Sequence, residues 1–192
     1  MRRVVPWLRR QWGAVVVLLA SVIVAGFLLH VDYGDEFGAT YTTQVGVTTK
    51  LNDSTRMLVT GLRFAGRIQE GSRITLATSE VFLVIDYTVA VDDVPYGTLS
   101  AKLTAGQMTY SSITSSLVVP APGFQRRRHL VYEVSLANVS GAQLTMVAAR
   151  DLRQFERIVV VDLGLTPQKV AELTAERYQT VELVDGDDEV QR

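Results

Sequence analysis

The stretch that decides the fold runs from Val81 to Val91 and reads VFLVIDYTVAV. Its odd positions are all apolar or aromatic: Val81, Leu83, Ile85, Tyr87, Val89 and Val91. Its even positions are mixed and include Asp86 and Thr88. Side chains of a β-strand alternate between two faces, so this pattern predicts a central strand with one fully buried face.

Segments of similar character, rich in Val, Ile, Thr, Tyr and Leu and separated by turn residues, lie on both sides of this strand. We expect further strands over Thr40–Val47, Arg56–Phe64, Arg73–Ala77, Leu99–Thr104, Met108–Ser111, His129–Leu136, Gln143–Ala149, Arg157–Leu163 and Thr180–Val184. No helical pattern separates the strands before residue 164. The spacing therefore predicts an all-β fold, an immunoglobulin-like Greek-key sandwich over residues 40–184.

The end of the chain carries a helix signal and an acidic segment. Thr166 is suited to cap a helix that has Pro167 at its first position, which predicts a short helix over 167–177 on one end of the sandwich. Residues 185–192 read DGDDEVQR, with four acids and one arginine. We expect this segment to be a disordered acidic tail.

An apolar segment of twenty residues, 12–31, precedes the predicted sandwich and reads WGAVVVLLASVIVAGFLLHV. A helix of this length rises by about 30 Å, the thickness of the hydrocarbon core of a bilayer. Trp12 and Val31 mark the ends of this predicted transmembrane helix. Ser21 and Ala25 have the small-xxx-small spacing that lets a second helix approach closely.

The charges around this segment predict its orientation. A basic leader, residues 1–11, carries Arg2, Arg3, Arg9 and Arg10, whereas the linker over 32–39 begins with Asp32 and the next positive residue is Lys50. Positive charge stays on the cytoplasmic side. We therefore expect a single-pass protein of the plasma membrane with a cytoplasmic N-terminus and an extracellular or periplasmic domain.

Two alternatives to a signal anchor remain open. A cleavable signal peptide would use Val24-Ala25-Gly26, but this triplet lies inside the apolar run. The pair Arg9-Arg10 is similar to a twin-arginine export signal but lacks the flanking residues of such signals.

Overall composition excludes several classes of protein. With 19 basic and 20 acidic residues the net charge is -1, and the four arginines of the leader leave -5 for the rest of the chain. An acidic body behind a basic leader is not the charge distribution of a nucleic-acid-binding protein. The absence of cysteine excludes disulfides, thiol catalysis, iron–sulfur clusters and a lipoprotein anchor.

Three segments together resemble a known family: FLVIDYTVAV at 82–91, the Pro122-Gly123 loop, and LVYEVSLANVSGAQLTM at 130–146. Their order is similar to that in a bacterial domain-of-unknown-function family of secreted or membrane-anchored immunoglobulin-like domains, the immunoprotective extracellular type. The resemblance implies an extracytoplasmic β-sandwich that serves as a binding or accessory module, without a common enzyme activity. The chain departs from the family in ending its central strand with Asp92-Asp93 and in having no lipid-anchor cysteine.

One charge run on the outer domain is a candidate binding site. Arg126, Arg127 and Arg128 precede His129, and the four residues could bind anionic lipid headgroups, an acidic wall polymer or a partner protein. The alternative is a solvated loop without a ligand.

Catalytic and metal-binding residues are not predicted. His30 lies at the membrane boundary, so a Ser-His-Asp triad has only His129 to use. The pair Asp92-Asp93 lacks the spacing of a calcium loop. Asp86 and Asp162 lie inside apolar strands, where we expect each to make a structural hydrogen bond to a loop or an arginine. No cofactor is expected.

These observations favour an accessory or interaction protein of the cell envelope that docks on a membrane partner, such as a transporter, an export machine or a wall-synthesis complex. The alternative is a module that binds envelope lipid or glycan through the basic run. A weaker alternative, a hydrolytic or metal-dependent enzyme, would need a polar pocket containing His129 or Asp86.

Overall fold

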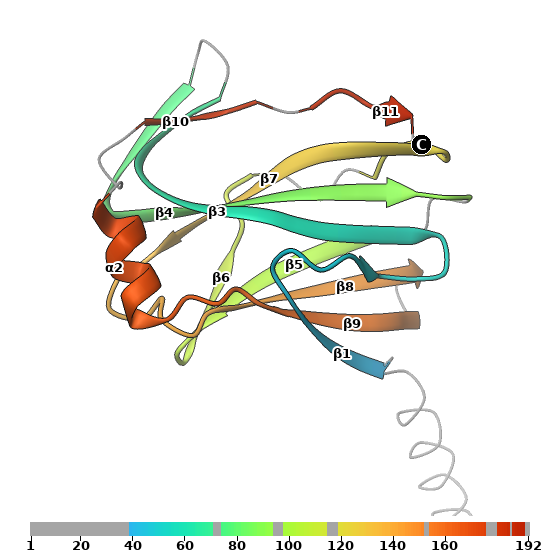
Figure 1. The fold of residues 1–192 in the computed structure, drawn as a ribbon, viewed down its shortest axis with the longest axis horizontal. Coiled ribbons are helices and arrows are strands. Elements are labelled where there is room, and N and C mark those ends of the chain that lie inside the picture. The colour runs from blue at the N-terminus through green and yellow to red at the C-terminus, as the bar shows by residue number, and fades with distance from the viewer. Residues whose placement is uncertain are drawn as a thin grey trace, which may run out of the picture. The chain divides into compact units, whose positions relative to one another are not determined.

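Two β-sheets lie on opposite sides of a shared hydrophobic core (Figure 1). The structure is a computed structural model and describes residues 39–70, 74–93, 98–114, 119–151, 154–175, 180–184 and 186–190. All of them belong to one unit of the chain, Gly38–Arg192. The all-β class predicted from the sequence is confirmed.

The first sheet, sheet A, contains five strands. In spatial order they are β1 (Ala39–Gln44), β9 (Gln154–Asp162), β8 (Gln143–Asp151), β5 (Thr98–Ala105) and β6 (Met108–Ser111). The strand β1 pairs with β9 in parallel, and the other neighbours are antiparallel.

The second sheet, sheet B, contains the stretch VFLVIDYTVAV, residues 81–91. Its spatial order is β10 (Thr180–Leu183), β3 (Thr55–Glu70), β4 (Ile74–Val91), β7 (Phe124–Val134) and β11 (Glu189–Val190), and β2 (Thr49–Lys50) pairs with β3. The long strand β4 is antiparallel to both of its neighbours, β3 and β7, whereas β10 runs parallel to β3.

The core between the sheets is built as the alternation predicts. All six odd-numbered residues of the stretch 81–91 are buried, and five of them join the main core cluster. From β7, Leu130, Tyr132 and Val134 join the same cluster. Burial of these side chains removes apolar surface from water, which is the dominant favourable term in folding.

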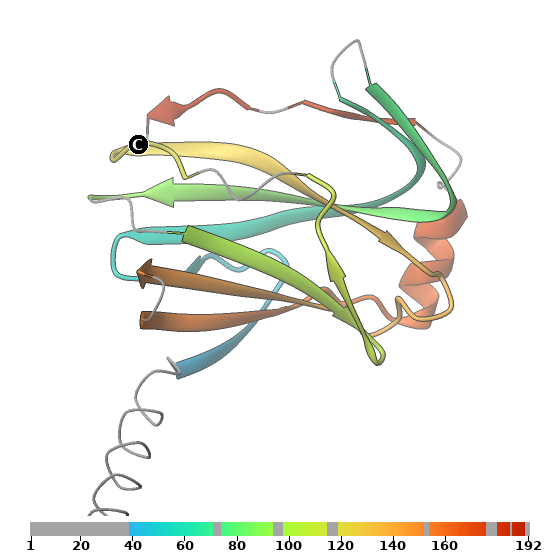
Figure 2. The ribbon, with the colours of Figure 1, turned by 180° about the vertical axis from the view of Figure 1, so that it is seen from behind.

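A second, smaller cluster lies on the outer face of sheet B. The even-numbered Phe82 and Val84 of β4 and Val131 of β7 are buried there beneath Val181 and Leu183. These two residues belong to a C-terminal strap, which we define as residues 180–184 and 186–190. Figures 1 and 2 show the strap running over the outer face of sheet B from β10 to β11.

The helix α2 (Pro167–Ala175) follows sheet A and begins at the predicted cap. The Thr166 hydroxyl accepts a hydrogen bond from the backbone N–H of Lys169 at 3.2 Å. Leu173 is buried and Val170 packs partly against the main core. The predicted start of the helix is confirmed; its described part ends at Ala175, and the predicted end at 177 lies outside the described residues.

Several expectations differ from the structure. The two strands predicted over 73–77 and 81–91 are not separate: residues 74–91 form one continuous strand, β4, and nearly all of them pair with β3 or β7. The three arginines of the charge run lie inside β7 and not in a loop. The segment 185–192 was expected to be disordered, yet Glu189–Val190 pairs with β7 because acids of the strap meet polar and basic side chains of that strand.

The predicted leader, transmembrane helix and most of the linker lie outside the described residues. This applies to the anchor residues Trp12, Ser21, Ala25 and Val31 and to the topology residues Arg2, Arg3, Arg9 and Arg10. Within the described ranges, no helix has both the length and the hydrophobicity needed to cross a bilayer.

Candidate functional site

A row of three residues crosses sheet B on its outer face and forms the base of the site. Gly61 of β3 is the register partner of Asp86 on β4, and Asp86 is the partner of His129 on β7. A register shift in β3 between Val59 and Gly61 inserts Thr60, which is typical of a β-bulge. A Cβ atom at Gly61 would lie 3.3 Å from Oδ2 of Asp86, so the glycine leaves room for this carboxylate.

The Asp86 carboxylate is held by two cationic side chains. Arg63 donates from Nε to Oδ2 at 3.1 Å and from Nη2 to Oδ1 at 2.7 Å. His129 Nδ1 lies 2.5 Å from Oδ1. Only 19% of the Asp86 side chain and 8% of the His129 side chain are exposed. The prediction that Asp86 makes a structural hydrogen bond to an arginine is confirmed.

Both ring nitrogens of His129 face hydrogen-bond acceptors. Nε2 lies 2.8 Å from the backbone carbonyl oxygen of Val184 in the strap, and a carbonyl can only accept. The ionised carboxylate of Asp86 on the other side can also only accept. His129 therefore donates from both nitrogens and is an imidazolium when Asp86 is ionised.

The pKa values of the pair reflect this arrangement. Burial alone would raise the pKa of Asp86, but hydrogen bonds from His129 and Arg63 and their positive charge hold that pKa below its ordinary 3.8. The hydrogen bond to Asp86 raises the pKa of His129 above its ordinary 6.5, and the hydrogen bond to the Val184 carbonyl raises it further. Burial and the positive charge of Arg63 act in the opposite direction and lower the pKa of His129. The network thus favours the charged forms of both groups.

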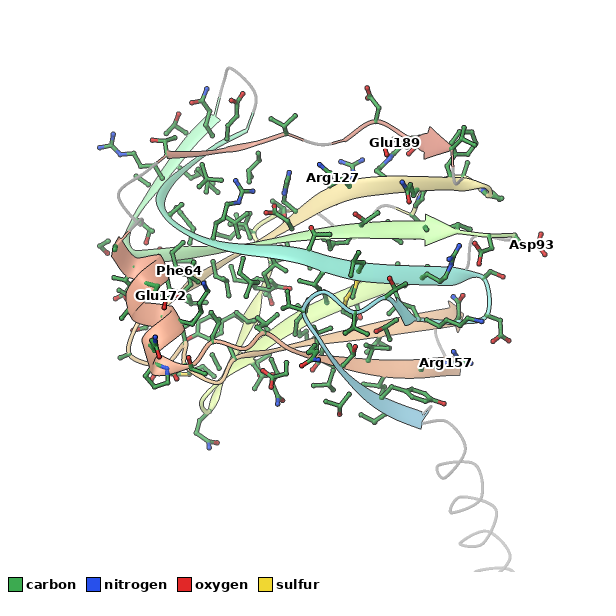
Figure 3. All side chains as sticks on the ribbon, viewed as in Figure 1. Phe64, Asp93, Arg127, Arg157, Glu172 and Glu189 are labelled. Carbon is green, nitrogen blue, oxygen red and sulfur yellow. The ribbon has the colours of Figure 1, made fainter. Side chains whose placement is uncertain are left out.

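A recess of about 590 Å³ lies over this network and is partly covered by the strap. Sheet B contributes Thr60, Arg63, Asp86, Arg127 and His129, and the strap contributes Glu182, Val184, Gly186 and Glu189. In Figure 3, Arg127 is labelled between β7 and the strap, and Glu189 is labelled on the strap itself. A second hollow of about 390 Å³ adjoins the recess, since Thr60 and Arg127 line both.

The structure separates the residues of the predicted basic site. Successive side chains of β7 alternate between faces, so Arg127 and His129 lie on the outer face at the recess, while Arg126 and Arg128 lie in the rows of Val89 and Tyr87 on the other face. Arg126 forms an ion pair with Asp188 of the strap. The run therefore does not form one basic patch.

Other predicted polar residues have structural contacts. Asp162 is exposed, and its carboxylate accepts a hydrogen bond from the backbone N–H of Gly164 at 2.9 Å, as expected for a loop contact. Asp92 pairs with Arg56 at 2.5 Å, and both side chains are about two-fifths exposed. Among the described residues, no group of three or more His, Asp or Glu side chains could hold a metal ion.

Neither Arg63 nor the strap was predicted from the sequence to be part of the site. The period-two pattern places Asp86 on the mixed face of its strand and His129 opposite Leu130, but it does not say which strands are neighbours. One signal was available for the strap: Val181 and Leu183 alternate with polar residues before Gly186.

Comparisons with known proteins add no relative: no family model, no curated protein and no solved structure matches this chain. The resemblance to the immunoprotective extracellular type of domain stays a prediction.

Proposed function

We propose that this protein is a signal-anchored accessory protein of the cell envelope, whose extracytoplasmic β-domain docks on a membrane partner. The domain would act by binding and not by catalysis. In this proposal the basic leader keeps the N-terminus in the cytoplasm, and the domain lies outside the plasma membrane.

The observation that supports this proposal is the start of β1 at Ala39. The predicted transmembrane helix ends at Val31, so seven residues, 32–38, separate it from the first strand. A fully extended chain spans at most about 3.6 Å per residue, which limits the tether to about 25 Å. A domain on such a short tether can reach only partners near the membrane surface.

We also infer that the two sheets form an immunoglobulin-like Greek-key sandwich. Five connections between successive described strands cross from one sheet to the other, namely β1 to β2, β4 to β5, β6 to β7, β7 to β8 and, through α2, β9 to β10. Pairing of β4 with β7 and of β5 with β8 joins strands that are not consecutive in the chain. This order supports the Greek-key interpretation.

A photo-crosslinking experiment in intact cells tests the docking proposal. Figure 3 places Asp93 and Arg157, the register partner of Ala39, toward one end of the domain and Glu172 at the other. A photo-reactive residue at exposed position 93 should give an adduct with a defined membrane protein, whereas one at exposed position 172 should give much less. Equal labelling from both positions, or none from position 93, would contradict the tethered arrangement.

The orientation has its own test. Protease added to right-side-out membrane vesicles should digest the β-domain, because the proposal places that domain outside. If the protease digests the domain only after the vesicles are opened, the domain lies in the cytoplasm and the proposal is wrong.

Binding of an anionic envelope ligand is a second candidate function, supported by the position of Arg127 at the recess. Because Arg128 lies on the opposite face of β7, it provides a matched control. Arg127→Gln should weaken binding to vesicles of anionic lipid several-fold, and Arg128→Gln should not. Equal binding by both variants and the parent protein would argue against this candidate.

The enzyme hypothesis receives partial support, since Asp86 and His129 do lie together at a polar recess. A general base, however, needs a ring nitrogen with a free lone pair. Both nitrogens of His129 face acceptors, and Nε2 is directed at the Val184 carbonyl and not at a nucleophile. This geometry favours a structural role for His129.

A further inference from the structure

We propose that the outer face of sheet B is a groove for an extended peptide segment of a partner, and that the C-terminal strap occupies it as a built-in competitor. The inference rests on the proposed docking function and specifies its surface and regulation. Three successive parts of the groove, apolar, central and basic, carry the proposal.

The apolar part receives two alternate aliphatic residues. Val181 and Leu183 are each 8% exposed and pack in the cluster with Phe82, Val84 and Val131. The strand β10 also pairs in parallel with the end of β3 over four register pairs. Backbone pairing combined with slots for alternate side chains is how sheets bind extended peptides.

The central part of the groove forms hydrogen bonds with the backbone of the strap. The Val184 carbonyl accepts from His129, and the N–H of Gly186 donates to the Arg127 carbonyl at 3.1 Å. A Cβ atom at Gly186 would lie 3.1 Å from Cβ of Arg127 and 3.4 Å from its carbonyl oxygen. The groove therefore selects a glycine at this position.

The basic part receives acidic side chains. Here the strap lies along the edge of β7: Glu189 accepts a hydrogen bond at 3.3 Å from the side-chain amide of Gln125 on the outer face, and Asp188 forms an ion pair around the edge with Arg126, which lies on the other face. Glu189 and Val190 pair with the first two residues of β7. The charge of Arg126 thus complements an acid two positions after the glycine.

The strap itself has the character of a bound ligand and not of a core strand. Its inward residues contact sheet B, whereas Val184 and Val190 are 63% and 67% exposed. Among the described residues of the strap only Val181 and Leu183 are buried, so the buried surface that it gives up on leaving is confined to the apolar part. The partner segment should therefore be extended, with two alternate aliphatic residues, a glycine three positions later and an acid two positions after that.

The test uses the full-length chain in mild detergent and a fluorescent peptide, TVELVDGDDEV, that copies residues 180–190. Gly186→Val in the protein should dislodge the strap, because the added side chain meets Arg127. Binding measured by fluorescence anisotropy should then be about tenfold tighter than with the parent protein, since a larger fraction of grooves is open. Val184→Ala, which keeps the carbonyl contact, should bind the peptide as weakly as the parent.

A peptide with valine in place of its glycine should fail to bind Gly186→Val protein. If the Gly186→Val protein loses its β-sheet circular dichroism, the Arg126→Glu protein provides a second test. It should bind a peptide in which lysine replaces the residue that corresponds to Asp188, and it should bind that peptide more tightly than the native peptide. Failure of the native peptide to bind folded Gly186→Val protein, or of the charge exchange in Arg126→Glu protein, would overturn the proposal.

These results are distinguishable from failure of the docking function. If the peptide binds but no membrane protein is crosslinked, the peptide groove is supported and the docking on an envelope partner is contradicted. If a partner is crosslinked but the peptide does not displace it from Gly186→Val protein, the docking function is supported and the groove is not its binding surface.

Discussion

Replacing Asp86 by asparagine should destabilise the domain more than any other single loss of charge in sheet B. Asparagine has nearly the same shape, so the packing of β4 is retained while the negative charge is removed. Arg63 and His129 then lose their shared carboxylate, and His129, only 8% exposed, remains beside a neutral group.

The size of the effect follows from the exposure of the two partners. Arg63 is 39% exposed, so its ion pair contributes about 1 kcal/mol after screening by solvent. The hydrogen bond between the buried imidazolium and the carboxylate contributes about 2 kcal/mol. We expect the free energy of unfolding to fall by about 3 kcal/mol near pH 6.

The loss should depend on pH in a defined direction. The pKa of His129 is raised by folding, so its contribution is complete below 6.5 and disappears as the pH rises through the folded value. The pKa of Asp86 is lowered, so its contribution is present above 3.8 and disappears as the pH falls through its folded value. The difference between parent and variant should therefore be largest near pH 6 and shrink at alkaline pH to about 1 kcal/mol from Arg63.

Urea unfolding of the full chain in mild detergent, followed by circular dichroism of the β-sheet, measures this difference. Asp92→Asn is the matched control, because Asp92 also pairs with an arginine but both partners are about two-fifths exposed. We expect the control to cost less than about 1 kcal/mol at every pH. Equal losses in the two variants, or a loss at Asp86 that does not change between pH 6 and alkaline pH, would refute the imidazolium network.

Two further predictions concern the core and the helix. The buried hydroxyl of Tyr132 has no hydrogen-bond partner among the described residues, so Tyr132→Phe should leave stability unchanged or raise it by about 1 kcal/mol, and a loss in urea unfolding would reveal a missing partner. Thr166→Ala removes the helix cap and should lower the free energy of unfolding by about 1 kcal/mol. The control Glu172→Ala, on the exposed face of α2, should lower it by about 0.5 kcal/mol or less, and equal losses in urea unfolding would contradict the capping role.

The part of the fold that depends on local pattern was predictable. The alternation in VFLVIDYTVAV identifies the buried face of β4, and Thr166 with Pro167 identifies the start of α2. Both signals act over a few residues and need no knowledge of distant segments. The paired site of Asp86 and His129 was not predictable in the same way, because 43 residues separate the two and only the pairing of β4 with β7 brings them together.

The basic run and the acidic end of the chain show a second limit. Three adjacent arginines look like one patch in the sequence, but a strand directs neighbours to opposite faces, and the sequence did not reveal that β7 begins before them. The segment DGDDEVQR has the composition of a disordered tail. Its described residues are ordered by contacts with Arg126, Arg127 and Gln125, which composition does not report.

The position of β10 and β11 at the two margins of sheet B has a consequence for solubility. Unpaired backbone groups along a sheet edge are a template for joining other chains, and natural proteins cover or block such edges. Here one short segment supplies the terminal strand at both edges. Proteolytic trimming of that segment would leave β3 and β7 partly unpaired at once, and a trimmed domain should aggregate long before its core is disturbed.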